Sequence, residues 1–220
     1  MYELAIVTAF AILAYRNLNV HDDEFANTSR KIGDRVGKLW DIAHLSMREN
    51  RLLRAEKALL TILKIDEKNA AAYNRLGILY AKQKEFRDAI DCFEIASSIE
   101  ATPSSLHNLG LIYYETENYD KAAVAFEQAL KLEDKLAARH VAYAKVQEKL
   151  GNYKMMFNEL ERAAELEPNK ETYSLLLKAY ETHDMVKEAD IVEAKLKKLL
   201  KPKSAPKTRR MIRPPRRVVV

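Results

Sequence analysis

A short pattern that recurs after 33 residues constrains the fold of this chain more than any other feature of its sequence. The run Leu-Gly-Ile-Leu-Tyr at 76–80 returns as Leu-Gly-Leu-Ile-Tyr at 109–113. The same offset relates three further residues to identical ones: Ala89 to Ala122, Phe93 to Phe126 and Ala96 to Ala129. A fixed period of roughly 20–50 residues is typical of stacked supersecondary units, because one unit is too small to bury its apolar face alone.

The composition favours helices in these units. The 220 residues include only five Gly and six Pro, which are too few for a turn-rich β-sandwich or β-barrel. No alternation of apolar and polar residues extends beyond a few positions, so no strand is predicted. Thr102-Pro103 has the form of a helix start, with Thr102 as the N-cap and Pro103 at the first helical position. We therefore predict an all-α fold.

The recurring residues resemble the tetratricopeptide repeat, a helix–turn–helix unit of about 34 residues. Its first helix carries a large apolar residue, then Leu-Gly, then Tyr, and its second helix carries Ala, an aromatic residue and Ala. The first copy fills these positions with Tyr73, Leu76, Gly77, Tyr80, Ala89, Phe93 and Ala96. The second copy has Leu106, Leu109, Gly110, Tyr113, Ala122, Phe126 and Ala129. The resemblance implies that the small residues let the two helices approach closely, Gly77 beside Ala89 and Gly110 beside Ala122.

Weaker copies flank this pair. Downstream, the register is kept first by Tyr143, Gly151, Leu160 and Ala163, and then by Tyr173, Leu176, Tyr180 and Ala189. Upstream, a degenerate first copy is indicated by Ala43, Ala55, Leu59 and Ile62. The resemblance implies a right-handed superhelical solenoid of about five units over 36–202: about 36–69, 70–102, 103–136, 137–169 and 170–202.

The segment before the repeats, residues 1–35, contains an apolar helix and a linker. Leu4 to Tyr15 is nearly uniformly apolar, and as a helix its twelve residues span roughly 18 Å. The hydrocarbon core of a bilayer is about 30 Å thick. Three interpretations stay open: a helix buried against the first repeat, a membrane anchor, or a self-association helix. The expected location is the cytoplasm, with membrane attachment through this segment as the open alternative.

The segment after the repeats, residues 203–220, is predicted to be a disordered, basic, Pro-rich tail. Residues 201–220 hold eight Lys and Arg, no acid and four of the six Pro. The rest of the chain has 29 bases and 32 acids, so the net charge of +5 comes from this tail. The candidate contacts with an anionic partner are Arg209, Arg210, Arg213, Arg216 and Arg217. A solvated tail that aids solubility is the alternative interpretation.

No constellation of catalytic or metal-binding residues is found in the sequence. Cys92 precedes Phe93 of a second helix and is expected to be a buried, inert thiol. The sequence lacks a nucleophile elbow, a phosphate-binding Gly loop and the HExxH motif. Metal-ligand spacing is also absent among the five His residues: His21, His44, His107, His140 and His183. We expect no enzymatic activity, no cofactor and no metal site.

The resemblance places a binding surface on the first helices of the units. In such repeats these helices line a concave groove, where the exposed residues are those not used in packing. The candidate groove residues are Trp40, His44, Asn74, Arg75, Ile78, His107, Asn108, Leu111, Tyr114 and Lys145. Asn and His can hydrogen-bond an extended peptide backbone, and the apolar members offer pockets. For each residue, a solvated position on the helix face is the alternative interpretation.

A specialised form of these repeats grips the acidic C-terminus of chaperones with a clamp of Lys, Asn and Arg on three first helices. Asn108 matches the middle Asn of that clamp. The other positions are not matched, because the neighbouring units offer Asn74, Ile78, Ala138 and Ala142. The sequence therefore argues against the chaperone clamp.

Two functional hypotheses from different classes follow. The first is a non-enzymatic interaction scaffold that binds a peptide or protein in the groove, with membrane tethering through Leu4 to Tyr15 left open. The second is a nucleic-acid- or ribosome-associated accessory protein that uses its basic tail. The oligomeric state is not determined by the sequence.

Overall fold

The structure, a computed structural model, describes residue 28 and residues 30–200. The predicted N-terminal apolar segment and the predicted basic tail lie outside the described residues. Within these limits the chain forms ten helices and no strand, so the predicted all-α fold of five helix–turn–helix units is confirmed. The pairs are the helix over residues 30–48 with α2 (Leu52–Ile65), α3 (Ala70–Gln83) with α4 (Phe86–Ile99), α5 (Pro103–Glu115) with α6 (Tyr119–Leu132), α7 (Ala137–Lys149) with α8 (Tyr153–Leu166), and α9 (Lys170–Thr182) with α10 (Val186–Leu200).

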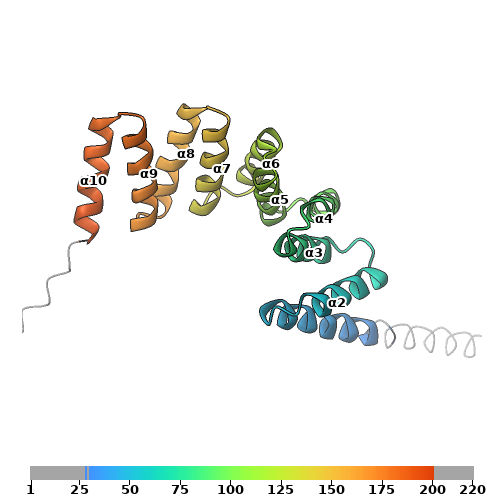
Figure 1. The fold of residues 1–220 in the computed structure, drawn as a ribbon. Coiled ribbons are helices and arrows are strands. Elements are labelled where there is room, and N and C mark those ends of the chain that lie inside the picture. The colour runs from blue at the N-terminus through green and yellow to red at the C-terminus, as the bar shows by residue number, and fades with distance from the viewer. Residues whose placement is uncertain (1–27, 29, 201–220) are drawn as a thin grey trace, which may run out of the picture.

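The pairs stack side by side in chain order to form a curved array (Figure 1). Its first helix already includes residues 30–35, which the sequence analysis grouped with the N-terminal segment. Ala43 and Met47 of this helix are buried against Ala55 and Leu59 of α2. Helical structure therefore extends upstream of the expected start of the first unit at about residue 36.

Each turn between the two helices of a unit contains one residue with left-handed backbone. These residues are Asn50, Lys84, Glu117, Gly151 and Asp184, with φ between 55° and 74°. Only Gly adopts this conformation without steric cost, and Gly is used in one unit of the five. Asn50 and Asp184 adopt this conformation more readily than most residues, so the steric cost falls mainly on Lys84 and Glu117.

In the second and third units, a Gly of the first helix faces an aromatic ring of the second helix. The ring of Phe93 on α4 lies against Gly77 on α3, and the ring of Phe126 on α6 lies against Gly110 on α5. A Cβ added at Gly77 would lie 2.7 Å from Phe93 Cε1. The predicted close approach is present, and the atoms nearest to a Cβ at either Gly would be those of the Phe ring.

A repeated hydrogen bond joins neighbouring units. Tyr80 of α3 donates its hydroxyl proton to Glu56 of α2 at 2.9 Å. Tyr113 donates in the same way to Glu94 of α4, and Tyr180 donates to Glu161 of α8. Burial, followed by the hydrogen bond to the carboxylate, raises the pKa of all three Tyr hydroxyls. The Tyr of the repeat pattern therefore bonds a second helix of the preceding unit as well as filling the core.

Candidate functional site

The first helices of successive units share one face of the array. Beyond its contacts with α4 and α6, α5 touches α3 on one side and α7 on the other. Among the described helices, no two second helices pack together to that extent. A stack in which one row of helices is in closer contact curves toward that row. The first helices therefore lie on the inner side of the curve, where the sequence analysis placed the groove.

The groove has an open hollow between the helix over residues 30–48 and α3. It measures about 710 Å³ and is lined by Asp41, His44, Leu45, Met47, Arg48, Arg75, Ile78 and Lys82. Three predicted groove residues, His44, Arg75 and Ile78, are thus brought together. The predicted Trp40 is half-buried, and its ring stacks on that of His44 with 5.6 Å between centroids.

The middle of the groove is formed by α3 and α5. Asn108 of α5 donates a side-chain hydrogen bond to the Asn74 side chain of α3 at 3.2 Å, so these two predicted residues are partly engaged with each other. Leu111 is 38% exposed. Tyr114 is half-buried and packs edge-on against Tyr119, with 5.6 Å between ring centroids. Leu111 is therefore the apolar group that this part of the groove offers most openly.

His107 is more enclosed than the sequence suggested. It is half-buried, and its ring lies 5.4 Å from that of Phe126 in an edge-to-face contact. Its Nδ1 atom is buried without a hydrogen-bond partner among the described residues. Burial lowers the pKa of His107, and the nearby positive charge of Arg139 lowers it further. These contacts favour a neutral His107 that packs against α6 of its own unit, and its contact with a ligand stays a prediction.

A second hollow, of about 200 Å³, lies between α7 and α9. Its lining includes the predicted Lys145, and it adds Lys178 and His183, which the sequence analysis did not assign to the groove. Lys178 follows Lys145 by 33 residues, so the repeat period was the signal that could have identified it. The fifth unit thus contributes to the groove as the other units do.

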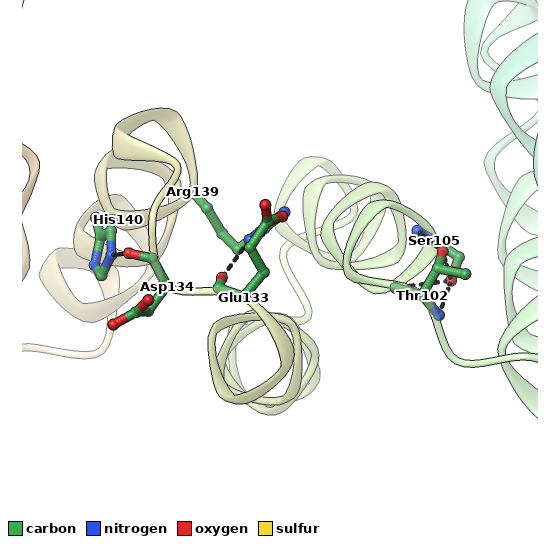
Figure 2. Close-up of polar contacts among 6 residues, drawn as sticks. All are labelled: Thr102, Ser105, Glu133, Asp134, Arg139 and His140. Atoms are coloured by element: carbon green, nitrogen blue, oxygen red, sulfur yellow. Dashed lines mark hydrogen bonds and ion pairs between the residues drawn. The ribbon is translucent and has the colours of Figure 1, made fainter. Parts of the chain in front are cut away.

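The link between α6 and α7 is held by two consecutive buried basic residues, Arg139 and His140 (Figure 2). Arg139 has a side chain only 2% exposed and donates to the Glu133 backbone carbonyl and carboxylate. His140 lies 2.7 Å from the Asp134 carbonyl through Nε2 and 2.6 Å from a Glu159 carboxylate oxygen through Nδ1. Both neighbours accept hydrogen bonds, so both ring nitrogens act as donors in the protonated ring.

The electrostatics of His140 agree with this geometry. Burial alone would lower its pKa, but the hydrogen bonds to Glu159 and to the Asp134 carbonyl outweigh burial and the charge of Arg162, and the pKa is raised. The sequence analysis treated His140 only as lacking metal-ligand spacing. Its role here is to anchor the link between two units.

We searched the described residues for metal ligands, a reactive thiol and a membrane-spanning helix. They contain no group of three His, Cys, Asp or Glu that could hold a metal ion. Cys92 is buried, and burial, followed by the charges of Asp91 and Asp88, raises its pKa to about 11. Within residue 28 and residues 30–200, no helix is long and apolar enough to cross a membrane.

Comparisons with known proteins agree with the geometry. Models of the tetratricopeptide-repeat family match residues 70–102, 103–136 and 137–170. Among curated proteins, none matches the chain in sequence. Among solved structures, the crystal structure of MamA protein is 20% identical, covers 76% of this chain and 92% of its own, and has a TM-score of 0.67.

Two further structures have the same fold. MamA (41-end) from Desulfovibrio magneticus RS-1 is 14% identical, with 78% of this chain and 98% of that chain covered and a TM-score of 0.68. YrrB, described as a tetratricopeptide-repeat protein with an unusual peptide-binding site, is 19% identical, with 72% and 82% covered and a TM-score of 0.61. The family matches, the ten paired helices and these structures together identify the chain as a tetratricopeptide-repeat protein.

Proposed function

We propose that this protein is a non-enzymatic interaction scaffold that binds a peptide or a protein segment in the groove of its first helices. Tetratricopeptide repeats serve in general as protein-interaction scaffolds. The observation that carries the proposal for this chain is the hollow between the helix over residues 30–48 and α3. It combines exposed apolar and charged side chains on a face that no other part of the described chain covers.

The groove offers the two kinds of contact that an extended peptide needs. The amides of Asn74 and Asn108 form a polar pair at its centre and retain further donor and acceptor capacity for a peptide backbone. Ile78 and Leu111 occupy corresponding positions one repeat apart, so the apolar contacts recur along the groove. A ligand that spans two or more units would therefore find alternating polar and apolar sites.

The experiment is a selection of random dodecapeptides displayed on phage against the full chain, followed by affinity measurement on the synthesised peptides. Leu111→Gln removes an exposed apolar group from the groove. Val124→Gln makes the same change on α6, where Val124 is 54% exposed. Loss of one buried Leu contact amounts to about 1.5–3 kcal/mol, which is at least tenfold in the dissociation constant. The Leu111 variant should show this loss and the Val124 variant should not.

A selection whose peptides bind both variants as tightly as the parent chain contradicts the proposal. The alternative function, binding of nucleic acid through the basic tail, rests on Arg209, Arg210, Arg213, Arg216 and Arg217, which lie outside the described residues. No described contact favours it over the groove.

A further inference from the structure

Charge is distributed unevenly between the row of first helices and the row of second helices. The five first helices, including residues 30–48, carry twelve Lys and Arg against six Asp and Glu, a net charge of +6. The five second helices carry twelve of each and are neutral. The excess of basic over acidic residues among the described helices therefore lies on the row that forms the groove.

In the hollow between the helix over residues 30–48 and α3, this charge is not neutralised by ion pairs. Arg48, Arg75 and Lys82 line the hollow, and none has an ion-pair partner among the described residues. Asp41 is the one acidic residue of the lining. On α6 and α10, in contrast, a Lys pairs with the Glu four residues before it at 2.7 and 2.8 Å.

Apolar groups lie among these cations. Leu45 is 44% exposed, Ile78 is half-buried, and Met47 closes the hollow beneath them. A small inorganic anion would use the cations but gain nothing from the apolar side chains. A peptide ligand that carries carboxylates beside aliphatic side chains would contact both the cations and the apolar side chains of the hollow.

The hollow between α7 and α9 repeats this combination. Lys145 and Lys178 lie one repeat apart and have no ion-pair partner in the described part of the chain. Glu148 is the only acid of the lining, and Val141 and Leu175 provide apolar surface. Two separate hollows of the same groove therefore share the same chemistry.

We infer that the ligand of this groove is an acidic protein segment in which Asp or Glu residues are interspersed with apolar side chains. The inference rests on the proposed function and specifies the chemistry of its partner. The aliphatic floor favours a protein segment over a nucleic acid, because binding of single-stranded bases relies on stacking against open aromatic faces. The Trp40 ring is instead stacked on His44.

The test uses the full chain and two labelled dodecapeptides. One contains four Glu distributed among Leu, Gly and Ser, and the other has Lys in place of each Glu. The groove variant carries Arg48→Gln, Arg75→Gln and Lys82→Gln. The matched control removes the same charge from the tail by Arg213→Gln, Arg216→Gln and Arg217→Gln. Thermal melting compares the fold of both variants with that of the parent chain.

The acidic peptide should bind the parent chain and the tail variant equally, and the groove variant roughly tenfold more weakly, because three exposed charge contacts are removed. The Lys peptide should bind at least tenfold more weakly than the Glu peptide. Equal binding of the two peptides, or a loss confined to the tail variant, overturns the inference. Binding of a twelve-nucleotide single strand in the groove more tightly than the acidic peptide also overturns it.

Failure of this inference can be told apart from failure of the proposed function. The selected peptides can lose affinity for the Leu111→Gln variant, yet have no excess of Asp and Glu and bind the groove variant normally. That result supports a ligand in the groove and excludes an acidic one. If the selected peptides bind the Leu111→Gln variant as tightly as the parent chain, the proposed function itself is contradicted.

Discussion

Substitution of Gly77 by Ala tests the account of helix pairing within a unit. The added Cβ would lie 2.7 Å from Phe93 Cε1 and 2.8 Å from Cδ1 and Cζ. Carbon atoms in ordinary contact are about 3.5–4.0 Å apart, so the ring must move by roughly 1 Å. Phe93 is 1% exposed and is surrounded by other core side chains, which leaves little space for that movement.

The size of the effect follows from two opposing terms. Insertion of a methyl group into a packed core costs about 1–3 kcal/mol. Ala is favoured over Gly in a helix interior by up to about 1 kcal/mol, which offsets part of that cost. We therefore expect Gly77→Ala to lower the free energy of unfolding by up to about 2 kcal/mol.

Gly37→Ala is the matched control, because it makes the same change inside the helix over residues 30–48. No atom lies within 4 Å of the Cβ that would be added there. Only the propensity term applies, and the variant should gain up to about 1 kcal/mol. Urea unfolding followed by far-UV circular dichroism measures both variants. If Gly77→Ala stabilises the protein as Gly37→Ala does, the ring does not occupy the space above Gly77 and the reasoning is refuted.

Three further predictions concern hydrogen bonds and histidines. Tyr80→Phe removes the bond to Glu56 and should cost about 1 kcal/mol in urea unfolding; an unchanged stability would mean that the bond does not join the first two units. His140→Gln should lower the free energy of unfolding by about 1.5–3 kcal/mol below about pH 6.5. This difference from the parent chain should vanish as the pH rises through the folded-state pKa of His140, which is raised. A difference that does not change with pH would contradict a protonated His140 as the anchor. His107 has the opposite sign, because its folded-state pKa is lowered: His107→Leu should make unfolding less sensitive to acidification below about pH 6.5, and an acid sensitivity equal to that of the parent chain would show that His107 is not held neutral.

The fold could be predicted from the sequence because its packing residues recur at a fixed period. The positions of Gly77, Phe93, Gly110 and Phe126 were sufficient to indicate helical pairs. The resemblance named the approach of Gly77 to Ala89, and the structure adds that the Phe93 ring supplies the atoms nearest to a Cβ at Gly77. A pattern of residue types defines which positions pack, but the contact partner depends on side-chain direction, which the pattern does not contain.

The contacts between units were harder to predict. Leu136 stands where α7 would need an N-cap, and its side chain makes no capping bond, whereas Thr102 caps α5 as predicted. Arg139 and His140 instead hold the preceding link from inside the helix, because their side chains donate to the Glu133 and Asp134 carbonyls. The absence of a capping residue followed by two bases in the first turn was the available signal.

The candidate groove residues were predicted by position, and position does not determine exposure. The structure brings His44, Arg75 and Ile78 together around one hollow. It encloses His107 beside Phe126, because the side chain there turns toward the next helix of its own unit. Lys178 was missed although the repeat period relates it to Lys145, which was assigned to the groove. Binding by any of these residues remains a prediction.

Photo-crosslinking of a selected peptide to the full chain tests the central claim most directly. The photoreactive residue benzoylphenylalanine is placed at Leu111 on α5 in one variant and at Val124 on α6 in another, both of which are exposed positions. The account predicts crosslinking at Leu111 that unlabelled peptide abolishes by competition, and none at Val124. Competed crosslinking at Val124, with none at Leu111, would show that the partner binds the second helices and would contradict the account.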